Sequence, residues 1–158
     1  YMDTFQAVAI VGGGSIIAAG FAANATGDYD ILIAKYSDAG VLDNSFGTNG
    51  IVMYDGGNLE YVTCMAIDGS GNIYLGGAVD SGSGFDAGCW KFDSTGSIVS
   101  AFGTGGLFSH DAAAGATNGD DAVFGIAIDL SGNIVLTGFS TNTDTTPNSD
   151  MVTWRITP

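Results

Sequence analysis

The chain has 158 residues, with 3 Lys and Arg against 17 Asp and Glu, for a formal net charge of −14. A chain of this length can fold as one domain without a metal or disulfides. Three cations cannot form the cationic patch that a phosphate backbone or an anionic membrane surface needs, which excludes nucleic acid and such membranes as partners. No apolar run reaches the ~20 residues of a spanning helix, so membrane insertion is not expected. Glycine supplies 26 residues and every acid except Glu60 is Asp, so the composition predicts a turn-rich, all-β, acidic protein.

One motif occurs three times, at offsets of 57 and then 61 residues. Its copies span 9–20, 66–77 and 127–138. A second block places an Asp five residues before a cation in each copy, and a Phe-Gly-Thr-x-Gly block occurs at 46–50 and 102–106. These three ordered blocks predict a single repeat domain over 1–158. The repeats are about 1–57, 58–118 and 119–158.

Apolar runs bounded by turn signals predict strands in each repeat. In chain order they are 8–11, 16–19, 31–36, 51–54, 65–67, 73–75, 87–92, 107–109, 126–128, 134–136 and 151–156. Gly-Asn pairs at 71–72 and 132–133 indicate hairpins, and no window of helical length has a 3.6-residue apolar period. Four antiparallel strands per repeat are typical of a β-propeller blade. The first strands are apolar on both faces, as strands between two neighbouring blades must be.

A family resemblance rests on two stretches, 30–50 and 127–138. They resemble the delta-60 repeat family and the seven-bladed-propeller (SBBP) repeats of bacterial surface proteins. The resemblance covers essentially the whole chain, and it implies a propeller-like array on extracellular or cell-surface proteins without a known catalytic role. The chain departs from the pattern at 11–15, where the first copy lacks the Asp-initiated turn, and after Pro158, where the third copy lacks its Phe-Gly block.

The expected location is extracellular or on the cell surface. Low Lys with abundant Gly, Ser, Thr, Asn and Asp is associated with secreted bacterial surface proteins. The chain starts at Tyr1 and has no signal-peptide pattern, so we expect either a removed leader or an excised piece.

The strand count predicts association. Eleven strands are one short of three full blades, and three blades are too few to close a ring. An open array exposes apolar faces and strand edges. We therefore expect a fragment, half of a six-bladed homodimer, or a subunit that accepts a strand from its neighbour and polymerises.

No catalytic set is recognisable. His110 is the only histidine, and its neighbours Ser109 and Asp111 point to the opposite face of a strand. The chain has no nucleophile elbow, zinc-type spacing or P-loop. We expect a non-enzymatic structural repeat protein that acts by self-assembly, including filament formation by strand complementation, or by adhesion. The alternative is a glycan- or peptide-binding propeller module.

All three cations occupy the same repeat position, which predicts one structural ion pair per repeat. The expected pairs are Asp30 with Lys35, Asp86 with Lys91, and Asp150 with Arg155, or these cations with the turn aspartates Asp68 and Asp129.

Two turns carry oxygen-bearing side chains at alternate positions, as calcium loops begin. The calcium candidates are Asp68, Ser70, Asn72, Asp129, Ser131 and Asn133. Neither turn has a closing Glu. An Asx turn, in which the Asp accepts hydrogen bonds from local backbone N–H groups, is therefore favoured, and no cofactor is expected.

The two cysteines are expected to be free and buried. Cys64 and Cys89 fall on strands that are next but one to each other, about 10 Å apart, which is too far for a disulfide.

Overall fold

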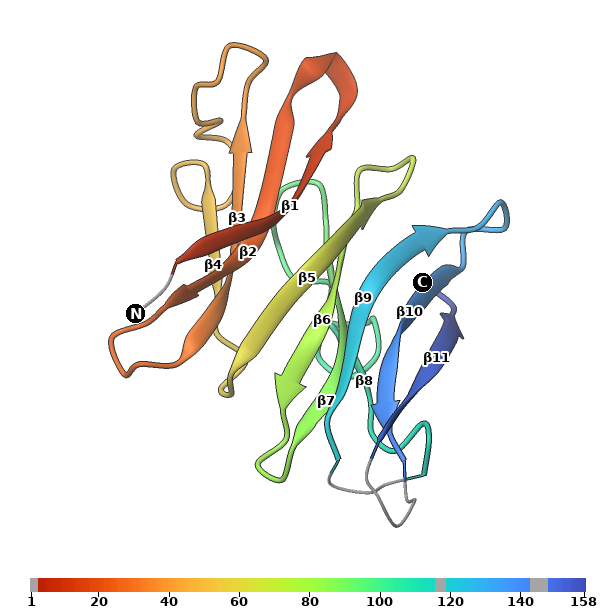
Figure 1. The fold of residues 1–158 in the computed structure, drawn as a ribbon. Helices are drawn as coiled ribbons and strands as arrows, with labels where there is room; N and C mark the ends of the chain where they lie inside the picture. Colours follow the sequence, from red (N-terminus) through yellow and green to blue (C-terminus); the bar gives the residue numbers. More distant parts are fainter. Residues whose placement is uncertain (1–2, 116–118, 143–147) are drawn as a thin grey trace.

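The computed structural model describes residues 3–115, 119–142 and 148–158. Eleven strands form three antiparallel sheets within these residues (Figure 1). Sheet 1 comprises β1 (Thr4–Ile10), β2 (Ile16–Ala23), β3 (Tyr29–Tyr36) and β4 (Ile51–Tyr54), with a short 3-10 turn, η1 (Gly12–Gly14), between β1 and β2. Sheet 2 comprises β5 (Glu60–Ile67), β6 (Ile73–Asp80), β7 (Phe85–Phe92) and β8 (Leu107–His110). Sheet 3 comprises β9 (Asp121–Ile128), β10 (Ile134–Thr141) and β11 (Ser149–Ile156).

The all-β class and the eleven predicted strands are confirmed. In every sheet the strands pair in chain order, as hairpin connections require. The strands group as four, four and three, so the prediction of four strands per repeat holds for sheets 1 and 2 only. The predicted boundary between the second and third repeats adjoins 116–118, which lie outside the described residues.

Sheet 2 lies between the other two sheets (Figure 1). Side chains alternate along β6, so Ile73 and Leu75 pack toward sheet 1 while Tyr74 packs toward sheet 3. The first core cluster joins sheets 1 and 2 through Ile17, Ala19, Ile31, Ile33, Phe46, Val62, Ile73, Leu75, Val79, Trp90 and Phe92. The second joins sheets 2 and 3 through Tyr74, Ala87, Cys89, Phe102, Val123, Ile134, Leu136 and Trp154. Burial on both faces explains why β6 is almost wholly apolar or small.

Each sheet has a β-bulge at the same repeat position. The register of the first strand shifts around Gln6 in β1, Thr63 in β5 and Phe124 in β9, which follow the repeat offsets of 57 and 61. The strand opposite each bulge carries a glycine, at Gly20, Gly77 or Gly138.

These glycines are required by close backbone approach. A Cβ atom on Gly77 would lie 1.7 Å from the carbonyl oxygen of Tyr61, and the other two glycines would meet a backbone oxygen at 1.8–2.0 Å. A bulge brings the partner backbone nearer than a side chain allows, so glycine is the residue that fits.

The bulges lie where the first strands of the three sheets run side by side (Figure 1). The Thr63 hydroxyl lies 3.1 Å from the carbonyl oxygen of Gly76 and 2.5 Å from that of Val123 in the next sheet. A polar contact therefore joins β5 to β9 at the bulge.

Replacing Gly77 by Ala is expected to lower the free energy of unfolding by about 2 kcal/mol or more, because the added methyl group overlaps a strand backbone that cannot move aside. The matched control is Gly69→Ala in the next turn toward the N-terminus, where a Cβ atom meets nothing within 4 Å. That control is expected to stay within about 0.5 kcal/mol of wild type. Urea denaturation measures both, and equal stabilities of the two variants would contradict the close approach.

Candidate functional site

The two Asp-initiated turns have the hydrogen bonds of an Asx turn. Asp68 Oδ1 accepts from the backbone N–H groups of Ser70 (2.8 Å) and Asn72 (2.9 Å), and its Oδ2 accepts from the Asn72 side chain. Asp129 accepts the equivalent bonds from Ser131 (2.8 Å) and Asn133 (2.9 Å). Local donors thus occupy the carboxylates that sequence analysis named as calcium candidates. The turns are five-residue connections, longer than a two-residue Gly-Asn hairpin.

The cations pair differently from the main sequence prediction. Lys35 Nζ lies 3.0 Å from Asp43 Oδ2, and Arg155 Nη2 lies 2.6 Å from Asp129 Oδ2. The ammonium of Lys91 instead lies 5.2 Å from the centroid of the Tyr74 ring. The pairing of Arg155 with a turn aspartate was the stated alternative.

The predicted pairs of Asp30 with Lys35, Asp86 with Lys91 and Asp150 with Arg155 are wrong. Each Asp stands five residues before its cation on one strand, and side chains an odd number of residues apart point to opposite faces.

The contact between Lys35 and Asp43 has a measurable consequence. A hydrogen bond from the Ser45 hydroxyl, together with the Lys35 ammonium, lowers the pKa of Asp43 to about 2. The carboxylate form is favoured in the folded state. The stabilisation that this carboxylate contributes is therefore fully present when the pH is above its usual pKa of 3.8, and it is lost as the pH falls through about 2.

We expect Lys35→Met to raise the pKa of Asp43 above about 2 but to leave it below 3.8, because the Ser45 bond remains. NMR titration of the side-chain carboxyl measures this value. Lys91→Met is the control, since Lys91 lies over aromatic rings. An unchanged pKa in Lys35→Met would show that the ion pair does not form in solution.

The cysteines lie on the predicted strands, but only Cys89 is buried, whereas Cys64 is partly buried. Cys64 on β5 and Cys89 on β7 are separated by Gly76 of β6, which pairs with both, and both are free. Burial raises the pKa of each thiol. The neutral thiols act as small apolar side chains in the second core cluster and its margin.

Three carboxylates meet at the junction of sheets 1 and 2. Asp30 belongs to β3, Asp55 follows β4, and Glu60 begins β5. One oxygen from each lies within 4.8 Å of the others. Asp30 and Glu60 are buried, whereas Asp55 is exposed. We call this group the junction cluster.

Glu60 is the most constrained member of the junction cluster. Its side chain is 1% exposed, and its Oε2 atom has no hydrogen-bond partner. The nearby backbone N–H groups of Gly56 and Asn58 act to lower the pKa of Glu60. Burial raises the pKa of Glu60 to about 7, and the negative charges of Asp30 and Asp55 act in the same direction.

A second group occupies the equivalent positions between sheets 2 and 3. Asp86, Asp111 and Asp121 correspond to the junction cluster in the repeat. Burial raises the pKa of Asp86, and repulsion from the other two carboxylates adds to it. Asp121 is fully buried and its Oδ1 atom has no partner.

Neither group of three carboxylates was predicted, although the sequence contains a signal for both. An acid stands at the start of the first strand in each repeat, at positions 3, 60 and 121, with the offsets of the repeat itself. The Asp at the start of the third strand also recurs.

The outer face of sheet 1 is apolar and uncovered. Phe5, Val8, Ile10 and Met53 are 46%, 70%, 70% and 49% exposed. The first three are the repeat equivalents of Val62, Met65 and Ile67, which pack against sheet 1 from the middle sheet.

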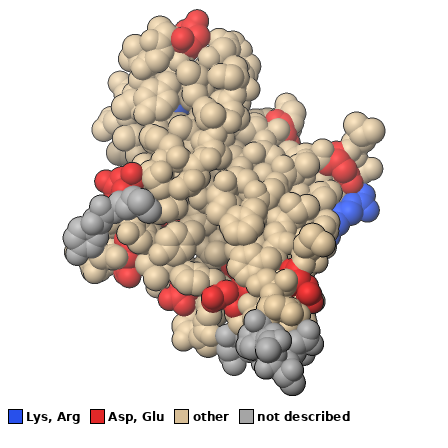
Figure 2. All heavy atoms as spheres, viewed as in Figure 1, with Lys and Arg blue, Asp and Glu red and all other residues tan. Residues whose placement is uncertain are grey.

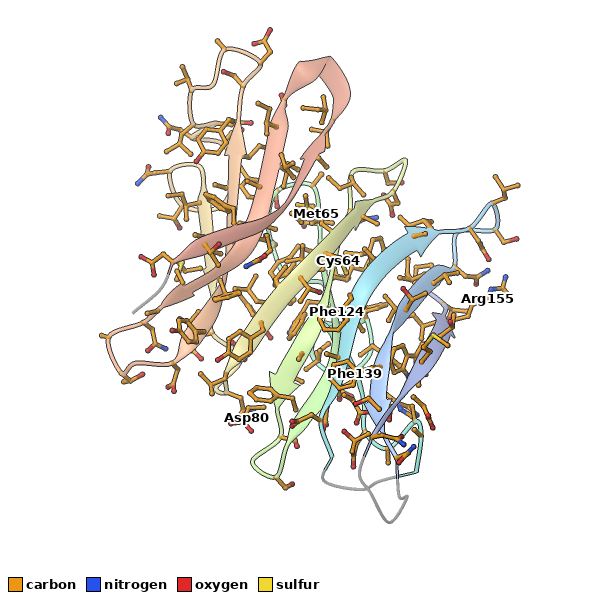
Figure 3. The ribbon with its side chains drawn as sticks, in the orientation of Figure 1. Cys64, Met65, Asp80, Phe124, Phe139 and Arg155 are labelled. Carbon is orange, nitrogen blue, oxygen red and sulfur yellow. The ribbon has the colours of Figure 1, made fainter. Side chains whose placement is uncertain are left out.

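The outer face of sheet 3 carries exposed apolar side chains as well, together with Thr137, Thr153 and Arg155. Phe124 on β9 is 60% exposed and packs against Phe139 on β10, with ring centroids 5.7 Å apart (Figure 3). Met151 on β11 is 97% exposed. On this face, the strands β9, β10 and β11 expose the repeat equivalents of the residues through which sheet 2 contacts sheet 3.

Charge is sparse near the first strands. On the side of the molecule that Figure 2 shows, the acidic side chains lie toward the rim and the centre is uncharged.

The chain matches no family model, and a search of curated proteins finds no match. Among the described residues, no helix is long and apolar enough to cross a membrane.

Proposed function

We propose that this protein is a non-catalytic structural repeat protein that assembles with copies of itself. The outer face of sheet 1 in one copy stacks on the outer face of sheet 3 in the next. Both faces carry exposed apolar side chains, and burying apolar surface is the main driving force of association.

Repeat equivalence is the observation that carries this proposal. Sheet 2 packs on sheet 1 through Val62, Met65 and Ile67, and the same positions in sheet 1 are Phe5, Val8 and Ile10. The outer face of sheet 1 thus exposes the same contact positions that sheet 2 uses to pack on sheet 1. A second copy can dock on sheet 3 with the geometry that already joins the sheets within one chain.

This contact joins two different faces, so it is heterologous. Such contacts close into rings or continue as filaments, according to the rotation between copies. A propeller-type ring of the delta-60 or SBBP kind corresponds to closure. In the open case, the edge of sheet 3 beyond β11, where sheets 1 and 2 carry a fourth strand, can accept a strand from a neighbour. An extracellular scaffold or adhesive layer is the setting we propose for either form.

Two single substitutions and their mixture test the stacking. Val8→Asp places a charge on the outer face of sheet 1, and Met151→Asp places one on the outer face of sheet 3. Each variant alone is expected to be monomeric by light scattering, because every head-to-tail contact then includes one charged face. An equimolar mixture is expected to give a dimer of one copy of each variant, since one intact pair of faces remains.

Leu130→Asp is the matched control. Leu130 is 110% exposed in the turn between β9 and β10, outside the strands that form the two faces, and its substitution is expected to leave assembly unchanged. A wild-type chain that stays monomeric at micromolar concentration would contradict the proposal. So would a mixture of the two variants that stays monomeric while the wild type assembles.

A second candidate function is glycan binding, which a row of aromatic rings favours. Tyr61 packs against Phe21, Tyr29 and Phe85 with centroids 5.1–5.5 Å apart. Sugars stack on partly exposed rings of this kind. Glycan-array signals that Tyr29→Ala abolishes would support this function, and an array without signal would contradict it.

A further inference from the structure

The junction cluster has the composition of a site for a hard divalent cation. We propose that Asp30, Asp55 and Glu60 bind Ca²⁺ and thereby join sheet 1 to the first strand of sheet 2. This site differs from the two turns that the sequence suggested, and it does not depend on the assembly proposed above.

The separation of the three carboxylate oxygens fits the ligand distances of calcium. Oxygen ligands lie about 2.4 Å from Ca²⁺, so two ligands of one ion stand at most about 4.8 Å apart. The three carboxylates meet this limit. Mg²⁺ demands a near-ideal octahedron at about 2.1 Å and usually keeps several waters, whereas Ca²⁺ accepts several protein carboxylates in a flexible geometry.

A buried oxygen atom without a partner points to the ion. Glu60 Oε2 is inaccessible to solvent and has no hydrogen-bond donor. A buried carboxylate oxygen without a partner is costly, and buried polar atoms are nearly always paired. The two ion pairs in the described part of the chain use Asp43 and Asp129, so neither supplies a positive charge to this cluster.

Asp30 and Asp55 are each held by one local donor, which leaves further carboxylate lone pairs for an ion. The Asn24 amide donates to Asp30 Oδ1 at 2.9 Å, and the Gly57 N–H donates to Asp55 Oδ1 at 2.7 Å. Glu60 is restrained by its burial, at 1% exposure. The three side chains are therefore restricted before an ion arrives, which lowers the entropy that binding loses.

The neighbouring group of Asp86, Asp111 and Asp121 is the repeat counterpart. Among the described residues, only the junction cluster brings three metal-ligating side chains within the calcium limit. One ion per chain is therefore the expected stoichiometry.

Isothermal titration with CaCl₂ tests the site on the full chain. We expect one ion per chain, with a dissociation constant on the order of 0.1–1 mM, as in extracellular calcium modules. Glu60→Gln removes one charge at nearly constant volume, and Asp55→Asn does so at an exposed position where folding is little affected. Each is expected to weaken Ca²⁺ binding by at least tenfold. Asp68→Asn in the β5–β6 turn is the matched control and is expected to bind as wild type does.

Thermal unfolding supplies a second readout. Millimolar Ca²⁺ is expected to raise the unfolding midpoint of wild type and of Asp68→Asn, because a ligand of the folded state stabilises it. The midpoint of Glu60→Gln is expected to stay constant. No heat of binding and no midpoint shift at millimolar Ca²⁺ would overturn the site. Unchanged affinity in Asp55→Asn, or loss of binding in Asp68→Asn alone, would also overturn it.

Terbium luminescence locates the ion. Tyr54 lies beside the junction cluster. Burial raises the pKa of Tyr54, and the nearby charges of Glu60 and Asp55 raise it further. Tb³⁺ bound at the junction cluster is expected to emit on tyrosine excitation, with the emission falling in Tyr54→Phe and competed away by Ca²⁺. Emission that Glu60→Gln leaves unchanged would place the ion elsewhere.

Discussion

Burial of the middle sheet on both faces is the constraint on which the rest of this structure depends. An antiparallel sheet usually keeps one face in water and alternates polar with apolar residues. In β6 polar and apolar residues cannot alternate, because both faces are buried. Ile73 and Leu75 face one neighbouring sheet, while Tyr74 and Ala78 lie on the other face. Sheets 1 and 3 also carry apolar residues on both faces, but each has only one neighbouring sheet. Their exposed apolar faces follow from that arrangement.

The bulges connect this packing to the buried acids. A bulge at Thr63 lets β5 run on beyond its apolar half to Glu60, which carries the carboxylate into the gap between sheets 1 and 2. The repeat places Asp121 likewise at the start of β9. An acid in a water-poor gap is tolerable only with donors or a counter-ion. The backbone N–H groups near Glu60 favour its charged form, but its Oε2 atom has no hydrogen-bond partner.

The repeating strands of the fold could be predicted from the sequence. The bulged strand halves and the side-chain partners could not, for physical reasons. Repeats, strand order and free cysteines follow from residue patterns. The N-terminal halves of β1, β5 and β9 were missed because a bulge breaks the two-residue alternation. The partners of Lys35 were misjudged because sequence proximity was weighed above strand geometry. Within the junction cluster, Asp30 is far in sequence from Asp55 and Glu60, and the pairing of β3 with β4 brings it to them, while the short β4–β5 connection holds Asp55 near Glu60.

The recurrence of bulge and glycine also bears on how such a chain can change in length. Gly20, Gly77 and Gly138 each lie opposite a bulge, and every interface between sheets uses the same positions. A tandem duplication of one repeat in the gene therefore encodes a complete layer, with its own close backbone approach and both of its contact faces. Evolution can lengthen or shorten the stack in whole layers, without inventing a new interface each time.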